Sequence, residues 1–388
     1  MDFDYADVIL VRFGEISLKS SNIRNRMINR LCKNINAVLE HRGVEGEVYN
    51  KWSRVFIEDF EDSGKVVDAV SKVPGVVSVS PCKVVNPKIE EMSSGLTDIA
   101  EEVFSGGSFG VDASRAGDKS VHSFTSQDIG REAGSAIYKS FDSVEVDLES
   151  PDQWFYVECR RNEAYLYAEK KQGPGGLPVG CEGKAVALIS GGHDSPVAAY
   201  RMMCRGCEII PVYISLGEYS SVAHEIRAKK TVEELKKFYP NGDWDLRVVD
   251  GGDAAELLMD ELKNTRMVSL RRFMFKAAET VAKEEGARGI VTGESIGQKS
   301  SQTLGNLDVS SRTVDIPILR PLLTFDKDEI VEMARDIGTF NGSKIDAGCT
   351  NVAPNRPETS GDGKRVLDLE PDKLLEIAVE AGKGAVVR

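Results

Sequence analysis

An apolar run at residues 185–189, followed at once by the serine- and glycine-rich segment 190–195, is the strongest constraint on how this chain folds. The run is short and uninterrupted, as expected of a strand buried on both faces of a parallel sheet. Residues 196–205 then have the pattern of a helix. A strand, a tight glycine turn and a helix start place free backbone N–H groups around an anion. The segment therefore predicts a phosphate-binding loop in an α/β domain.

A glycine pair between serines also occurs in ordinary tight turns, so the alternative interpretation is a connection without a ligand. The full pattern from Ser190 to Ser195, after a strand and before a helix, favours phosphate binding. Other nucleotide-binding motifs are missing from the sequence, which has no Gly-x-x-x-x-Gly-Lys-Ser/Thr and no Gly-x-Gly-x-x-Gly after a predicted strand. Walker-type and dinucleotide-binding domains therefore have no support.

Length and composition bound the class of protein. The 388 residues, 41% of them hydrophobic, are enough for two or three domains. No run approaches a membrane span and residues 1–4 are acidic, so we expect a cytoplasmic protein without a membrane partner. Seven cysteines without a dense framework suit a reducing compartment. The net charge of −13 counts against nucleic-acid binding unless basic residues gather locally.

Basic residues do gather on a predicted helix at residues 21–42. Its apolar residues recur at helical spacing, and no Asp or Glu occurs between Ile16 and Leu39. The cations are Lys19, Arg24, Arg26, Arg30 and Lys33. This pattern fits either a solvated helix face or a stripe that contacts RNA phosphates, and the residues alone favour neither.

The first half of the chain alternates strands and helices in short units, typical of α/β or α+β folds. A first unit combines the helix at 21–42 with strands at 8–13, 48–49 and 54–57. A second unit follows, with predicted helices at 64–73, 89–104 and 125–141 and strands at 76–80, 108–113, 144–148, 154–159 and 164–169. The Gly- and Pro-rich segment 171–178 is the clearest linker in the chain.

The second half predicts a doubly wound parallel sheet, because strands and helices alternate from residue 184. The predicted strands are 185–189, 208–214, 245–249 and 289–292, and the helices are 196–205, 223–238, 254–263, 269–285, 326–337 and 372–381. Ligands of such sheets bind at the carboxyl ends of the strands, where Tyr213 and Gly293 fall. Residues 354–364 are rich in turn-forming residues and predict a loop.

The segment Ser-Gly-Gly-x-Asp-Ser resembles the PP-loop of ATP pyrophosphatases, which cleave ATP to AMP and pyrophosphate. Further segments occur in an order similar to that of the tRNA 4-thiouridine synthetases, the ThiI family of tRNA sulfurtransferases. They are residues 12–20, 73–76, 271–272, 292–298, 301–303 and 319–322. The resemblance implies a ferredoxin-like domain at 1–60, an RNA-binding THUMP domain at 61–168, a linker at 169–182 and a PP-loop catalytic domain at 183–388.

The resemblance also implies a reaction. ATP adenylates the C4 oxygen of uridine 8 in tRNA, and sulfur then displaces AMP to give 4-thiouridine; a link to thiamine biosynthesis is implied as well. Asp194 would hold the Mg²⁺ that accompanies pyrophosphate. The ATP-contacting positions carried over by the resemblance are Leu188, Ile189, Ser190, Gly191, Gly192, Ser195, Tyr213, Ile214, Arg271, Gly293 and Gln302. Without the resemblance, Arg271 would be interpreted as an exposed helix charge, and His193 as a side chain turned away from phosphate.

Two cysteine features compete for the sulfur chemistry. Cys349 matches the family cysteine that carries persulfide sulfur. Cys204 and Cys207 form a Cys-x-x-Cys at a predicted helix end, where a redox pair, a partial metal site and simple packing are the alternatives. With Cys349 they would make a three-cysteine iron–sulfur site. The sequence leaves open whether a cluster is bound.

The chain resembles a short form of the family without a C-terminal rhodanese domain. Sulfur is then expected from a separate donor, either the persulfide of a cysteine desulfurase or sulfide, or through a cluster. The segment 112–119 is less basic than is usual for a THUMP domain, which weakens the case for RNA contact there. Alternatives are a PP-loop enzyme acting on a small molecule and a noncatalytic tRNA-binding protein; a homodimer is left open.

Overall fold

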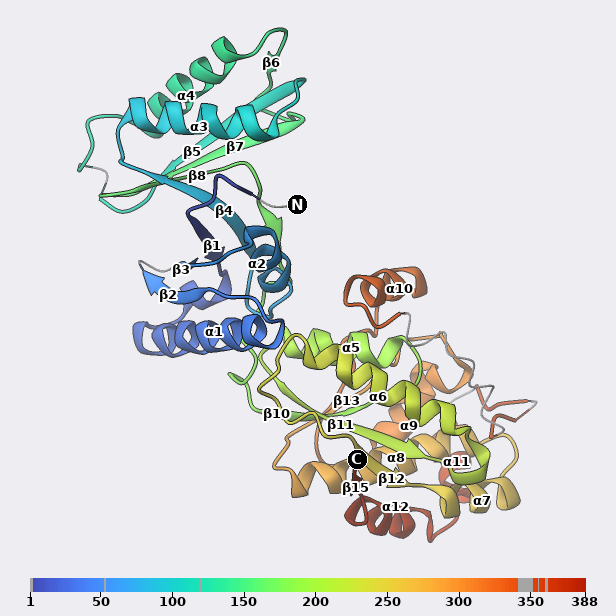
Figure 1. The fold of residues 1–388 in the computed structure, drawn as a ribbon. Coiled ribbons are helices and arrows are strands. Elements are labelled where there is room, and N and C mark those ends of the chain that lie inside the picture. The colour runs from blue at the N-terminus through green and yellow to red at the C-terminus, as the bar shows by residue number, and fades with distance from the viewer. Residues whose placement is uncertain (1–2, 52–53, 119, 341–351, 355, 360–361) are drawn as a thin grey trace. The chain divides into compact units, whose positions relative to one another are not determined.

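The computed structural model describes residues 3–388 except 52–53, 119, 341–351, 355 and 360–361. These residues form two compact units, Met1–Gly176 and Leu177–Arg388. The division falls within the predicted linker at 169–182. Each unit has its own sheet and its own core (Figure 1).

The N-terminal unit contains a nine-stranded sheet with the order β2-β3-β1-β4-β8-β7-β5-β6, and β9 pairs with β4. Its first half comprises β1 (Val8–Arg12), η1 (Glu15–Leu18), α1 (Ser21–His41), β2 (Glu47–Lys51), β3 (Arg54–Glu58) and α2 (Ser63–Val70). Its second half comprises β4 (Ser78–Val85), α3 (Ile89–Val103), β5 (Ser108–Arg115), α4 (Ser126–Ser140), β6 (Glu145–Val146), β7 (Gln153–Cys159), β8 (Ala164–Tyr167) and β9 (Lys171–Gln172).

The long strand β4 belongs to both halves of this sheet. Its first five residues, from Ser78 to Cys82, pair with β1, and its last three, from Lys83 to Val85, pair with β8. The helix α2 packs on α1 and β4, so the boundary expected at residue 60 falls inside a continuously packed unit. Sequence periodicity could not show this, because each half of β4 has the pattern of an ordinary short strand.

Aromatic side chains join the two halves of this unit. Phe56 of β3 and Tyr165 of β8 lie with ring centroids 5.2 Å apart, and Tyr49 stacks on Phe56 at 5.6 Å. Their cluster consists of strand residues alone, including Leu10 and Tyr167. Burial of this aromatic surface, together with the shared strand, fixes the halves against one another.

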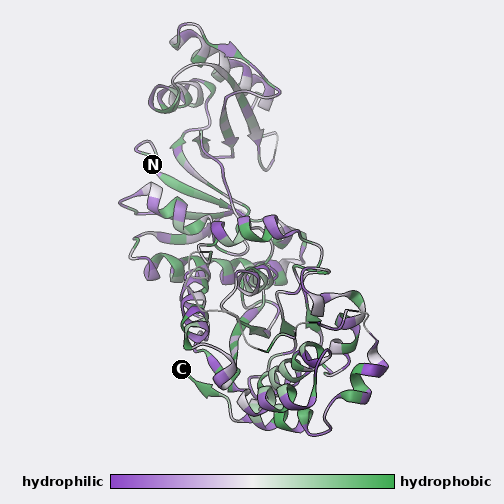
Figure 2. Ribbon diagram, turned by 90° about the vertical axis from the view of Figure 1, so that its right-hand side faces the viewer, coloured by the Kyte–Doolittle hydropathy of each residue, from purple (hydrophilic) through white to green (hydrophobic). Residues whose placement is uncertain are grey.

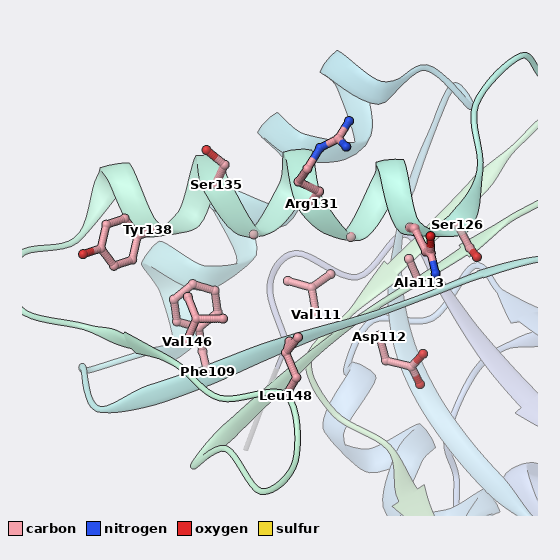
Figure 3. Close-up of a pocket in the computed structure, with 13 residues that line it drawn as sticks. Phe109, Val111, Asp112, Ala113, Ser126, Arg131, Ser135, Tyr138, Val146 and Leu148 are labelled. Atoms are coloured by element: carbon pink, nitrogen blue, oxygen red, sulfur yellow. The ribbon is translucent and has the colours of Figure 1, made fainter.

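Between α4 and β5 the second half contains an apolar cavity of about 720 Å³. Val111 of β5 and Val146 and Leu148 from the segment after α4 lie below the helix, which carries Tyr138 and Arg131 (Figure 3). Gly130 and Gly134 on α4 leave this space open, because neither has a side chain to fill it. The lining is predominantly apolar and holds no cluster of charged groups suited to polyphosphate.

The second unit contains a six-stranded sheet with the order β14-β13-β10-β11-β12-β15. All of its strands are parallel except β15, which is antiparallel to β12. The strands are β10 (Lys184–Leu188), β11 (Glu208–Ser215), β12 (Arg247–Asp250), β13 (Ile290–Val291), β14 (Ile318–Leu319) and β15 (Val386–Val387). The helices are α5 (Asp194–Met203), η2 (Gly217–Tyr219), α6 (Val222–Lys236), α7 (Gly252–Glu261), α8 (Arg266–Glu284), η3 (Ser300–Gln302), α9 (Leu304–Ser311), α10 (Lys327–Asp336), α11 (Gly363–Leu369) and α12 (Leu374–Lys383).

Helices cover both faces of this sheet, which confirms the predicted doubly wound fold. Ala185, Ala187 and Ile189 pack against α5, α6 and α10, whereas the alternate residues Val186 and Leu188 pack against α7, α8 and α12. The helices carry both hydrophilic and hydrophobic residues along their length (Figure 2), as expected of helices with one face in the core. The predicted loop at 354–364 ends at α11, which begins at Gly363.

Within the described residues, none of the helices combines the length and the apolar character that a membrane span requires.

Candidate active site

The segment from Ser190 to Ser195 forms a closed turn between β10 and α5. The Ser190 N–H donates to Ser195 Oγ over 2.9 Å, and the two serine hydroxyl oxygens lie 3.1 Å apart. The Gly192 N–H points at Ser190 Oγ at 3.4 Å. Ser195 is buried in the first turn of α5. The serines therefore hold the turn in shape, and the helix N-terminus leaves its first N–H groups for an anion.

Two glycines allow other parts of the chain to approach this turn. A Cβ on Gly191 would lie 2.7 Å from Cδ of Arg227. A Cβ on Gly293, just after β13, would lie 2.7 Å from the carbonyl carbon of Asp194 and 2.8 Å from the Ser195 nitrogen. Those two atoms are backbone and cannot rotate away, so only glycine permits β13 and α5 to meet at this point.

Asp194 makes an ion pair that sequence analysis did not predict. Lys327, the first residue of α10, donates from Nζ to Asp194 Oδ1 over 2.7 Å. Burial, and next the positive charge of Lys327, lower the pKa of the neighbouring His193, which favours its neutral form at pH 7. Partial burial, and next the charge of Arg271, lower the pKa of Lys299, which also lies near Asp194.

Arg271 lies beside a buried carboxylate that sequence analysis also missed. Glu294 is 1% exposed, and its Oε2 accepts a hydrogen bond from Arg320 Nε over 2.8 Å. Its Oε1 lies 3.9 Å from Arg271 Nε, too far for a hydrogen bond. Arg320 is held in turn by Ser311 Oγ at 2.9 Å and by the ring of Phe275. Glu294 thus attracts Arg271 and leaves its donors available.

Several buried polar atoms around the turn have no hydrogen-bond partner among the described residues. They are His193 Nε2, Arg227 Nε, Glu294 Oε1, both amide atoms of Gln298, and Gln302 Oε1. Buried polar groups in native proteins are almost always paired. Their concentration at the carboxyl edge of β10 and β13 indicates a polar ligand at this edge.

The strand-end residues predicted for nucleotide binding lie at the same edge. Leu188 and Ile189 end β10, and Tyr213 and Ile214 lie near the end of its neighbour β11. Their side chains are at most 7% exposed and pack into the two core clusters. The backbone at these positions, rather than the side chains, is therefore what a ligand can contact.

The two predicted cysteine features have different outcomes. Cys349 lies outside the described residues. Cys204 caps the C-terminal end of α5, roughly 15 Å from the turn at its N-terminal end, and Cys207 directly precedes β11. Both lie at the opposite edge of the sheet from the turn.

The environment of this pair disfavours thiolate chemistry. Burial raises the pKa of the Cys204 thiol to about 12 and also raises that of Cys207. Cys204 belongs to the apolar core of the unit. Among the described residues, no group of three or more His, Cys, Asp or Glu side chains is arranged to hold a metal. Cys204 and Cys207 thus lie in surroundings that suit packing, and the three-cysteine site stays a prediction because Cys349 lies outside the described residues.

The basic residues predicted for RNA contact lie on or just before α1. Lys19, Arg26 and Lys33 are exposed and Arg24 and Arg30 are half-buried. None of the five forms an ion pair with a described residue, and the first turn of α1 contains no acidic residue. These five cations are therefore available to an anionic partner.

A parallel sheet with helices on both faces, a serine–glycine turn leading into a helix, and unpaired polar groups at the strand ends define a PP-loop nucleotide-binding protein. Family models match three parts of the chain: the ThiI ferredoxin-like domain at 8–80, the THUMP domain at 87–169, and "Thiamine biosynthesis protein (ThiI)" at 180–374. The chain belongs to the ThiI family of tRNA sulfurtransferases.

Relatives and solved structures match over nearly the whole length. The chain is 44% identical to a probable tRNA sulfurtransferase of Halobacterium salinarum, covering 98% of this chain and 97% of that one. It is 36% identical to one of Methanosarcina mazei, covering 97% and 95%. A crystal structure of a 4-thiouridine synthetase in complex with RNA and ATP has 31% identity and a TM-score of 0.82, with 99% of both chains covered.

We predict that Gly293→Ala weakens ATP binding at least tenfold. The added Cβ would lie under 3 Å from three backbone atoms of Asp194 and Ser195 and would displace the N-terminus of α5. Calorimetric titration of the full chain with ATP measures the effect. Gly134→Ala in α4 is the control, since its Cβ meets nothing closer than 3.8 Å. An ATP affinity of Gly293→Ala within twofold of wild type would contradict the prediction.

We predict that Cys204 resists alkylation by iodoacetamide at pH 8 in the folded protein. With a pKa of about 12, the thiolate fraction there is on the order of 1 in 10,000. The thiolate fraction rises tenfold per pH unit, so labelling should accelerate as the pH increases. Mass spectrometry of the labelled peptides provides the measurement, and the chain unfolded in denaturant is the control. Rapid labelling of folded Cys204 at pH 8 would show that the thiol is accessible and ionised.

Proposed function

We propose that this chain is an ATP-dependent tRNA sulfurtransferase that converts uridine 8 to 4-thiouridine and releases AMP and pyrophosphate. The observation that carries the proposal is the set of unpaired buried polar atoms around the Ser190–Ser195 turn. A helix N-terminus with free N–H groups, next to glycines that let the backbone come close, is suited to bind a nucleotide polyphosphate. The relatives' names and the ATP- and RNA-bound structure support the same assignment.

The polyphosphate of ATP would lie over the Ser190–Ser195 turn. Ser190, Gly191, Gly192 and Ser195 would supply N–H and hydroxyl donors to it. Arg271 would offer its guanidinium, since Glu294 leaves its donors free. The adenine would lie against the strand ends at Leu188, Ile189, Tyr213 and Ile214, with Gly293 admitting the flat ring and Gln302 supplying its amide.

Asp194 is suited to hold the Mg²⁺ that accompanies pyrophosphate. Mg²⁺ is commonly bound by one or two carboxylates together with substrate phosphates. Lys327 engages one oxygen of Asp194, and its ammonium can turn to a phosphate when a cation takes its place. The bound metal would neutralise charge on the leaving pyrophosphate.

Adenylation solves the chemical problem of the uracil C4 oxygen, which is a poor leaving group. The C4 oxygen attacks the α-phosphorus of ATP as the uracil loses its N3 proton. An O–P bond forms, the bond from the α-phosphorus to the bridging oxygen breaks, and pyrophosphate leaves. Lysine and arginine side chains around the turn, Lys299, Lys327 and Arg271, would stabilise the charge that develops on the phosphates. A sulfur nucleophile then adds to C4 and AMP leaves.

A desulfurase persulfide would pass its outer sulfur to the Cys349 thiolate, which leaves the thiol of the donor and a Cys349 persulfide. The outer sulfur of that persulfide would displace AMP from C4, and a thiol reductant would then cleave the S–S bond to release 4-thiouridine. Free sulfide would instead displace AMP from C4 directly, without passing through Cys349. Cys204 and Cys207 lie at the far end of α5 from the turn and have raised thiol pKa values. We therefore assign them to packing and derive no step through an iron–sulfur cluster.

The RNA would bind to the N-terminal unit. The five cations Lys19, Arg24, Arg26, Arg30 and Lys33 are exposed or half-buried and form no ion pair with a described residue, so they can neutralise phosphates. We place the boundary between the ferredoxin-like and THUMP halves inside β4, near Cys82, instead of at residue 60. The PP-loop domain then starts near Leu177.

The decisive test is tRNA-dependent cleavage of ATP. We predict that unmodified tRNA, ATP and sulfide yield AMP, pyrophosphate and 4-thiouridine, and that Asp194→Asn lowers the rate by about two orders of magnitude. Asp336→Asn, at the exposed end of α10, is the matched control. Nucleotide chromatography and nucleoside mass spectrometry measure the products. Release of ADP, or no ATP cleavage with tRNA and sulfide present, would refute the proposal.

With a desulfurase persulfide as the sulfur donor, we predict that Cys349→Ala abolishes thiolation and spares pyrophosphate release, because adenylation precedes sulfur transfer. The double variant Cys204→Ala/Cys207→Ala should keep thiolation, since neither thiol lies near the turn. Iron analysis of anaerobically purified protein accompanies both assays. Thiolation by Cys349→Ala would remove that residue from the sulfur route. If the wild type contains stoichiometric iron and the double variant does not, an iron–sulfur cluster at Cys204 and Cys207 would instead be supported.

A further inference from the structure

A cavity of about 510 Å³ in the N-terminal unit is lined by three arginines. Arg54 comes from the start of β3, and Arg160 and Arg161 come from the turn between β7 and β8. The remaining lining is Ala116, Gly117, Asp118 and Val121, from the segment after β5. The cavity therefore lies where the two halves of the sheet meet.

The arginines around this cavity outnumber the carboxylates. Glu158, 5% exposed, accepts from Arg160 Nε over 3.0 Å. The same carboxylate also lies 3.7 Å from Arg12 Nη2 and 3.8 Å from Arg54 Nε. Burial lowers the pKa of Arg54; Glu158 partly opposes this, and the charges of Arg160 and Arg12 reinforce it. Among the described residues, the Glu158 carboxylate thus faces three guanidiniums, whose summed charge exceeds its own.

The remaining charges do not cancel this excess. Arg161 is exposed, and its guanidinium makes no ion pair or hydrogen bond with a described residue. Asp118, on the rim, has its Oδ1 engaged by the N–H and hydroxyl of Ser120. Glu163 nearby is paired with Lys51. Among the described residues, four arginines and Lys51 therefore face three carboxylates, which are Glu158, Asp118 and Glu163.

Hydrogen bonds hold the walls of the cavity in place. His122 Nε2 lies 2.9 Å from the carbonyl oxygen of Arg160, and the Ala116 N–H donates to the carbonyl of Cys159 over 2.9 Å. Arg115 donates to the backbone carbonyl of Phe124. The arginine side chains consequently project from a fixed frame, which lowers the entropic cost of ligand binding.

We propose that this cavity is a phosphate-binding site for the RNA backbone. Guanidinium forks match phosphate oxygens in geometry and charge, and a volume of this size admits a phosphate together with part of a flanking ribose. The site adds basic residues from β3 and the β7–β8 turn to the weakly basic segment 112–119. The inference rests on the proposed tRNA substrate and identifies a surface that the α1 cations do not include.

Binding of unmodified tRNA to the full chain tests the site, with Arg161→Gln as the principal variant and Arg54→Gln as the second. Because Arg161 is exposed and forms no ion pair with Glu158, we expect its replacement to leave the fold intact. We expect Arg161→Gln to weaken tRNA binding about threefold to tenfold and to reduce the slope of log K against log salt by about 0.7–0.9. ATP affinity should not change.

Arg131→Gln, an exposed arginine of α4 outside this cavity, is the matched control and should bind tRNA as wild type does. Unchanged tRNA affinity and salt slope in both Arg161→Gln and Arg54→Gln would overturn the inference. A second result would also overturn the inference. If Arg54→Gln weakens the binding of sodium phosphate or pyrophosphate but leaves tRNA affinity at the wild-type value, the site binds the free anion and not the RNA backbone. Failure of the wild type to bind tRNA would refute the proposed function instead.

Discussion

The parallel pairing of β10 with β11 on one side and β13 on the other is the constraint on which the candidate active site depends. Parallel strands end at the same edge of a sheet, so this pairing brings together segments that are over 100 residues apart in the sequence. Gly293 can then touch the first residues of α5 only because it has no side chain. The strand register, the close approach of Gly293 and the N-terminus of α5 together determine where an anion can bind.

In both proposed sites, one buried carboxylate lies among several arginines. In the second unit, Glu294 binds Arg320 tightly and Arg271 loosely. In the first, Glu158 binds Arg160 and lies near Arg12 and Arg54. A buried carboxylate with one arginine partner forms a neutral pair. A carboxylate that is shared among several guanidiniums leaves a net positive charge at the site. Such an arrangement suits proteins that must hold phosphate while carrying a net charge of −13.

The sequence was sufficient to predict the local features, but it did not predict contacts between residues far apart in the chain. The β10 strand, the turn after it and the helix α1 follow from apolar periodicity and glycine placement. The two-residue strands β14 and β15 carry too little pattern to be detected. The pairing of Asp194 with Lys327, 133 residues apart, and the arginine cavity arise only when the chain folds. The distant location of Cys204 could have been inferred, because eight helical residues lie between Ser195 and Cys204.

The shared strand β4 limits how far the two N-terminal halves can be treated as interchangeable modules. The family matches end at residue 80 and resume at residue 87. The residues that pair with β8, Lys83 to Val85, fall between them. A fragment that begins at residue 87 would expose the backbone edge of β8, and one that ends at residue 80 would lose Pro81 and Cys82, which pair with β1. An unpaired strand edge invites aggregation. Recombination between relatives would therefore preserve both halves only when β4 is inherited whole.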